Sequence, residues 1–188
     1  MNQIIKNTII LFVITLDPIA QAQEAAATKT YQEVYPDAAS FDEPQELADA
    51  VTAAADSISE WGFGKVTIND AKEALDASGN QIGYLITSTS AESYGGNVQI
   101  AVGITNEGEL TGIGFLSISD TPGLGMRAKE PDFKDQFIGK KAENLEVTKT
   151  GASADNQIEA ISGATITSKA VTNATDAAIY FVANCLAQ

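Results

Sequence analysis

The chain has 188 residues, of which 11 are Lys or Arg and 25 are Asp or Glu, and its formal net charge is −14. This length favours one domain with a substantial core, and the negative charge argues against nucleic acid as a partner. Because the sequence contains no His and only one Cys, Cys185, it excludes a Ser-His-Asp triad, a His-ligated metal or haem, an internal disulfide and a four-thiolate iron–sulfur cluster.

The first predicted element is an apolar run over residues 8–16, preceded by Lys6 and followed by Asp17-Pro18. It is shorter than the roughly twenty apolar residues of a membrane-spanning helix. It also has the shape of a signal peptide, with residues 20–22 as a cleavage site, and a buried core helix is a third interpretation. In the first two cases Lys6 stays in the cytoplasm. We therefore expect a cell-membrane protein with its acidic domain on the extracytoplasmic side, or a secreted or peripheral form.

We assign residues 1–27 to the apolar membrane segment and its connector, and residues 28–188 to the folded domain. Within residues 17–40 the chain is predicted to be helical or a loose connector. The spacing of Leu47, Val51, Ala54 and Ile58 predicts a helix over 45–58.

A β-rich middle follows this helix. Five segments have the composition or the alternation of strands, with turn signals at 76–80 and 106–108: residues 65–68, 71–75, 82–88, 98–104 and 110–116. Glycines inside the last two predict bulges, a surface that another segment approaches closely, or simple crowding of strands: Gly103, Gly112 and Gly114.

The C-terminal third is predicted to be mainly helical. Pro131 opens a short helix in which Phe133 and Phe137 share a face, and residues 145–148 form an edge strand. A last helix, residues 168–186, has an apolar stripe of Val171, Ala174, Ala178, Phe181, Val182 and Cys185. This order predicts an α+β fold with an antiparallel sheet and flanking helices.

The segment Glu159 to Ser168, with the sequence EAISGATITS, precedes this last helix. A helix start is an anion site because its first N–H groups lack partners and its dipole is positive there. Gly163 lets the backbone approach an oxyanion closely. Thr167 or Ser168 can cap the helix or can carry a phosphate, and from spacing alone capping is the more frequent role.

Two further segments have the composition of functional loops. Residues 120–126 read DTPGLGM, and residues 94–96 read YGG directly before the strand predicted over 98–104. Taken alone, the first is a turn in which Pro122 fixes φ and Gly123 supplies a positive φ.

Together and in this order, the three segments resemble the covalent FMN-binding domain family, which includes the G subunit of the Rnf ion-translocating oxidoreductase complex. The C subunit of the sodium-pumping NADH:quinone reductase is a longer member. The resemblance covers roughly residues 28–188. This chain has Glu159 where the family usually has Asp, and Asp120 where the family has Glu.

The resemblance implies one FMN, attached by a flavin transferase as a phosphoester to Thr167. The phosphate side is then shaped by Ser162, Gly163, Ala164 and Thr165, and the loop against the flavin by Thr121, Pro122, Gly123, Leu124 and Gly125. Four aromatic residues have rings that suit stacking on the flavin, but none is assigned to it: Trp61, Phe63, Tyr84 and Tyr94. We expect no metal and no catalytic residue.

The implied function is an electron-carrying subunit of a membrane complex that couples ferredoxin oxidation and NAD⁺ reduction to Na⁺ or H⁺ movement. Its partners are the other subunits, and it is not an enzyme on its own. Two alternatives stay open. One is a free-standing exported FMN protein that donates electrons to a separate reductase, and the other is a non-redox module whose Ser/Thr-rich loop only caps a helix.

Overall fold

The structure is a computed structural model that describes residues 18–141 and 144–186. The predicted apolar segment over residues 8–16 lies outside the described residues. Among the described helices, none has the length and apolar character needed to cross a bilayer.

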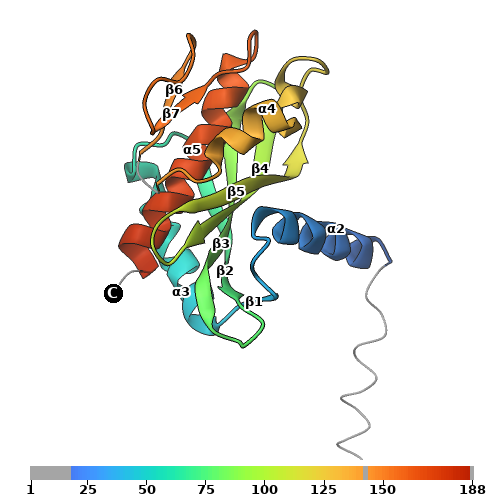
Figure 1. Cartoon of the computed structure of the whole chain (residues 1–188), viewed down its shortest axis with the longest axis vertical. Coiled ribbons are helices and arrows are strands. Elements are labelled where there is room, and N and C mark those ends of the chain that lie inside the picture. Colours follow the sequence, from blue (N-terminus) through green and yellow to red (C-terminus); the bar gives the residue numbers. More distant parts are fainter. Residues whose placement is uncertain (1–17, 142–143, 187–188) are drawn as a thin grey trace, which may run out of the picture.

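Five strands form an antiparallel sheet in which neighbours along the chain are also neighbours in space (Figure 1). They are β1 (Ser40–Asp42), β2 (Val66–Leu75), β3 (Gln81–Ser93), β4 (Gly96–Thr105) and β5 (Leu110–Ile118). The predicted turn over 76–80 joins β2 to β3, and Asp76 Oδ1 stabilises it by accepting hydrogen bonds from the N–H groups of Ser78 and Asn80. The predicted α+β fold with an antiparallel sheet is confirmed.

One strand differs from the prediction. Residues 65–68 and 71–75 belong to the single strand β2, whose pairing with β3 shifts between Ile68 and Asp70. The shift is a bulge with one extra residue, Asn69, in β2. Asn and Asp inside an apolar run indicate a turn in sequence, whereas here the bulge accommodates them within one strand.

Helix α5 (Thr165–Phe181) crosses one face of the sheet, with α3 (Gln45–Ala54) on the same side (Figure 1). The main core lies between α5 and the strands, where Ile86, Ile100 and Val171 are fully buried. The helix begins three residues before the predicted Ser168, and its last part is a π-helical turn, η4 (Val182–Leu186). Cys185 packs against the core, partly buried, as expected of a small apolar residue.

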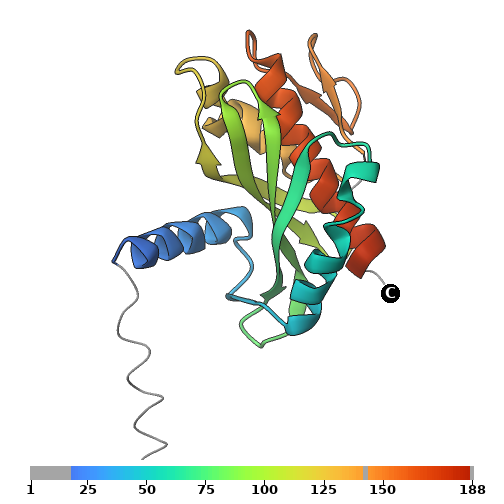
Figure 2. The same cartoon turned by 180° about the vertical axis from the view of Figure 1, so that it is seen from behind.

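Helix α2 (Pro18–Val34) packs on the opposite face, against β4 and β5 (Figure 2). The glycines of these strands make room for it. A Cβ on Gly114 would lie 2.5 Å from Thr30 Cγ2 and 2.6 Å from Val34 Cγ2. Of the explanations predicted for these glycines, the close approach of another segment, here α2, therefore applies to Gly114. The boundary predicted at residue 28 falls inside α2 and stays a prediction.

Short elements connect the sheet to α5. After β5 come η2 (Gly125–Lys129), α4 (Pro131–Lys134) and η3 (Asp135–Phe137), where the rings of Phe133 and Phe137 stack edge to face at 5.7 Å. Strand β6 (Glu146–Thr148) then pairs in parallel with β7 (Gln157–Glu159). The sequence predicted β6 but not β7, which leads the chain directly into the segment before α5.

Candidate functional site

A tight turn connects β7 to α5. The N–H of Ala164 donates to the carbonyl of Ile161 at 2.9 Å, and Gly163 has a φ of 81° at the third position of this turn. A positive φ at that position is the geometry that glycine adopts at the lowest cost. The helix follows at once, so its first N–H groups point away from its own hydrogen-bond ladder.

Two hydroxyls in the first turn of α5 have different partners. Ser168 Oγ donates to the carbonyl of Ala164 and accepts from the N–H of Ile161, both at 3.0 Å. Ser168 therefore ties the turn to the helix. Thr167 does not cap the helix, because its Oγ1 donates at 2.7 Å to Asp120 Oδ2 on a distant loop.

The loop after β5 forms a similar turn that faces the first one. The N–H of Leu124 donates to the carbonyl of Thr121 at 3.1 Å, and Gly123 has a φ of 75°. The predicted Pro-Gly turn is thus present. The two turns touch, because a Cβ on Gly163 would lie 3.0 Å from Leu124 Cδ2.

Asp120 joins these turns. Besides the bond from Thr167, its carboxylate accepts from Ser93 Oγ at 3.0 Å and from the N–H of Thr121 at 2.6 Å. Partial burial acts to raise the pKa of Asp120, but the hydrogen bonds from Thr167, Thr121, Ser93 and the N–H of Gly95 outweigh it, so the pKa lies below its usual value. The carboxylate is therefore ionised at neutral pH.

Two glycines leave room for this carboxylate. A Cβ on Gly125 would collide with the carboxyl group of Asp120, and a Cβ on Gly95 would collide with the backbone of Ser119 and Asp120. The glycines of the YGG and PGLG segments therefore do more than form turns. They allow Asp120 to sit against both segments and to reach the first turn of α5.

A pocket of about 510 Å³ opens between the two turns. Its lining residues come from three separate segments: Tyr94, Asp120, Thr121, Leu124, Gly125, Gly163, Ala164, Thr165, Ile166 and Thr167. Thr167 is fully buried at its edge. Three lining side chains are large, apolar and unusually exposed, at 73% for Tyr94, 41% for Leu124 and 55% for Ile166.

Seven predicted site residues line this pocket: Thr121, Leu124, Gly125, Gly163, Ala164, Thr165 and Thr167. The other three, Pro122, Gly123 and Ser162, belong to the same two turns without lining it. Sequence reasoning missed Asp120, Tyr94 and Ile166 as site residues. Asp120 and Tyr94 lie within the segments that resemble the family, residues 120–126 and 94–96. Their place in these segments was the signal from which they could have been predicted as site residues.

The other aromatic residues considered for flavin stacking do not line this pocket. Trp61 and Phe63 pack on Tyr180, with ring centroids 4.7 Å and 6.0 Å apart. Tyr84 packs against the main core.

The chemistry of the pocket fits FMN. The start of α5 suits a phosphate, and the exposed side chains of Tyr94, Leu124 and Ile166 suit a flat, largely apolar ring. A volume near 510 Å³ lies in the range of cofactor sites. The charged lining residue is Asp120, and Lys169 is exposed outside the lining, so the helix N–H groups are the groups placed to stabilise a phosphate.

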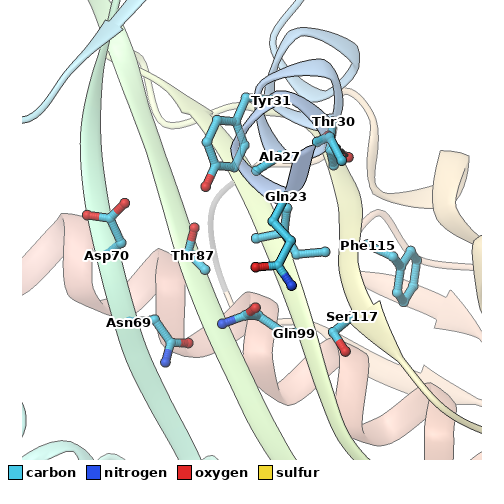
Figure 3. Close-up of a pocket in the computed structure, with 12 residues that line it drawn as sticks. Gln23, Ala27, Thr30, Tyr31, Asn69, Asp70, Thr87, Gln99, Phe115 and Ser117 are labelled. Atoms are coloured by element: carbon cyan, nitrogen blue, oxygen red, sulfur yellow. Dashed lines mark hydrogen bonds between the residues drawn. The ribbon is translucent and has the colours of Figure 1, made fainter. Parts of the chain in front are cut away.

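A second hollow, of about 610 Å³, lies between α2 and the other face of the sheet. Figure 3 shows polar side chains projecting from four neighbouring strands beneath the helix: Asn69, Thr87, Gln99 and Ser117. The small side chains of Ala26 and Ala27 leave this space open. This hollow is lined by no residue of the three segments that resemble the family. The smaller pocket at α5 is therefore the candidate site.

Comparison with known proteins identifies the family of this chain. The FMN-binding domain family matches residues 93–180, a range that contains every lining residue of the pocket at α5. The G subunit of the Na⁺-translocating ferredoxin:NAD⁺ oxidoreductase complex of Acetobacterium woodii is 35% identical over 179 residues, which cover 91% of this chain and 81% of that protein. The chain belongs to this family of G subunits.

Other relatives agree. The G subunit of the proton-translocating ferredoxin:NAD⁺ oxidoreductase complex of Clostridium ljungdahlii is 35% identical over 126 residues, which cover 61% of this chain and 67% of that protein. The crystal structure of the C subunit of the Na⁺-translocating NADH-quinone reductase of Parabacteroides distasonis has a TM-score of 0.51 and 18% identity, and the match covers 92% of this chain and 98% of that chain. The second likeness shows the fold alone. The expected family, the fold and FMN as the cofactor are confirmed.

Proposed function

We propose that this chain is the electron-carrying flavoprotein subunit of a membrane ion-translocating ferredoxin:NAD⁺ oxidoreductase complex, with FMN attached as a phosphoester to Thr167. The observation that carries this proposal is the position of the Thr167 hydroxyl. It lies at the pocket lined by all three segments that resemble the family, and on the first turn of α5.

FMN supplies the redox chemistry, and this chain supplies binding, orientation and electrostatics. The N–H groups at the start of α5 stabilise the phosphate charge. Tyr94, Leu124 and Ile166, which line the pocket, would offer the flavin an apolar surface. Thr167 is buried at the edge of this pocket and is one of its lining residues.

Partners and location follow from the same proposal. The relatives are subunits of complexes, so we infer that other subunits bind this chain and that a flavin transferase modifies it. With Lys6 on the cytoplasmic side, the apolar segment over residues 8–16 anchors the chain in the cell membrane and the FMN domain lies on the extracytoplasmic side. A peripheral or secreted form is the alternative if the apolar segment is removed.

The attachment is tested by producing the full chain together with a flavin transferase and measuring its intact mass and in-gel flavin fluorescence. The native chain should gain the mass of one FMN less one water. Thr167→Ala should gain nothing while it keeps its fold, because it lacks the acceptor oxygen. Thr167→Ser is the matched control, since it keeps a hydroxyl and should still be modified. Covalent FMN on Thr167→Ala would place the attachment elsewhere.

A further inference from the structure

The carboxylate of Asp120 occupies a position that is built from three separate parts of the chain. Ser93, at the end of β3, donates from one side, the N–H of Thr121 donates from its own loop, and Thr167 donates from α5. Glycine at 125 keeps space for the carboxyl group. This arrangement fixes one carboxylate oxygen, Oδ2, at 2.7 Å from the hydroxyl of Thr167.

Attachment of FMN requires a specific bond change at that hydroxyl. The phosphate of free FMN has no good leaving group, so the donor must be a flavin whose phosphate is part of an anhydride, as in a flavin dinucleotide. Thr167 Oγ1 forms a bond to the flavin-side phosphorus, and the anhydride P–O bond breaks. The nucleoside monophosphate leaves with the electron pair of that bond, and the hydroxyl proton needs an acceptor.

We propose that Asp120 orients the Thr167 hydroxyl and accepts its proton during flavin attachment, which makes it a catalytic residue for maturation of this protein. The inference rests on the proposed phosphoester at Thr167. Oδ2 takes the proton as the bond to phosphorus forms and then releases it to water. No electrons are transferred in this step.

The composition of the pocket favours Asp120 over other groups. Among the residues that line it, Asp120 has the carboxylate, and none has an amine or a guanidinium. The sequence contains no His, the usual proton acceptor in such reactions. The hydrogen bonds that hold Asp120 also keep it ionised at neutral pH, which is the form that can take a proton.

The test is a time course of covalent flavin addition, followed by intact mass, with the purified full chain, a flavin transferase and a flavin dinucleotide. Asp120→Asn keeps an acceptor oxygen for the hydrogen bond but is a far weaker proton acceptor. Its maximal rate should fall by about 100-fold or more, the usual range for a general base. The acceptor-protein concentration that gives half the maximal rate should stay unchanged. Asp120→Glu keeps a carboxylate and should be markedly faster than Asp120→Asn.

Two further variants separate chemistry from structure. Asp155→Asn removes one exposed carboxylate elsewhere and should match the native rate. Ser93→Ala removes one hydrogen bond to Asp120 without removing the proton acceptor, so its rate should fall far less than that of Asp120→Asn. Circular dichroism and thermal unfolding of each variant establish whether it is folded.

Three outcomes overturn the inference. An Asp120→Asn rate within about threefold of the native rate would exclude a general base. Equal losses in Asp120→Asn, Asp120→Glu and Ser93→Ala, with a raised half-saturating concentration, would indicate a structural role only. If the native chain gains no FMN, or gains it without Thr167, the proposed attachment fails as well, whereas normal attachment to Asp120→Asn leaves that attachment intact and refutes only the role of Asp120.

Discussion

Asp176 lies inside α5 with only 3% of its surface exposed, and its Oδ1 accepts a hydrogen bond of 2.9 Å from the N–H of Leu145. Burial raises its pKa from 3.8 to about 7, against the lowering effect of that bond. The folded state therefore holds this proton more tightly than the unfolded state. Its stabilising contribution is fully present below pH 3.8 and is lost as the pH rises to about 7.

We expect Asp176→Asn to remove this pH dependence. Asparagine keeps an acceptor oxygen for Leu145 but does not ionise. Between pH 4 and pH 7, the native chain should lose up to ~1.4 kcal/mol of unfolding free energy per pH unit relative to the variant. Urea unfolding across this range measures the difference. Asp155→Asn is the control and should follow the native curve, and parallel curves for native and Asp176→Asn would contradict the prediction.

Gly125 is a second residue whose role follows from a single contact. A Cβ at this position would collide with the carboxyl group of Asp120. Gly125→Ala should destabilise the fold by about 1–3 kcal/mol through overpacking, and it should slow FMN attachment because Asp120 is displaced. Denaturant unfolding and the mass assay measure the two effects.

Gly123→Ala is the matched control in the same loop. It meets no atom within 4 Å, but its φ of 75° is unfavourable for alanine. It should lower stability through backbone strain alone and leave the contact between Asp120 and Thr167 in place. Equal attachment rates for Gly125→Ala and the native chain would show that the space beside Asp120 is not required.

At the scale of elements, the packing of α2 on the sheet requires glycine at positions of the strands that face the helix. Val34 is 2% exposed, and its Cγ2 lies 2.6 Å from the position of a Cβ on Gly114. Gly114→Ala should force α2 away from β5 at a cost of about 1–3 kcal/mol. Amide hydrogen exchange should become faster in α2 while α5 stays protected.

Gly79→Ala, in the open turn between β2 and β3, controls for the general effect of replacing a glycine. It has a positive φ and no neighbour within 4 Å, so it should lower stability without changing exchange in α2. Unchanged exchange of α2 in Gly114→Ala would show that the helix does not depend on this contact.

At the scale of the whole molecule, the two faces of the sheet have different roles. One face carries α5 and the main core, and the first turn of α5 opens the candidate FMN pocket. The other face carries α2 and a hollow lined by polar side chains (Figures 1 and 2). The motif loops gather at the end of the molecule where α4, β6 and β7 lie, and the C-terminus lies at the other end (Figure 1).

Local patterns predicted most of the architecture. The alternation of apolar residues predicted β4, and helical spacing predicted α3 and α5. The Pro and Gly residues predicted the turn at Thr121. These features could be predicted because each signal acts over a few residues. The bulge at Asn69 was missed because a bulge interrupts alternation in the same way as a turn does. Strand β7 was missed because three residues contain too little pattern to be recognised.

The sequence by itself determined the antiparallel α+β order, the absence of histidine chemistry and the hydroxyl-rich segment before the last helix. Only the tertiary structure decided what Thr167 contacts. Asp120 is 47 residues away along the chain, and no local pattern encodes a hydrogen bond between a loop after β5 and the start of α5. That contact exists because the sheet, the two glycine turns and α5 pack together and bring one carboxylate to one hydroxyl.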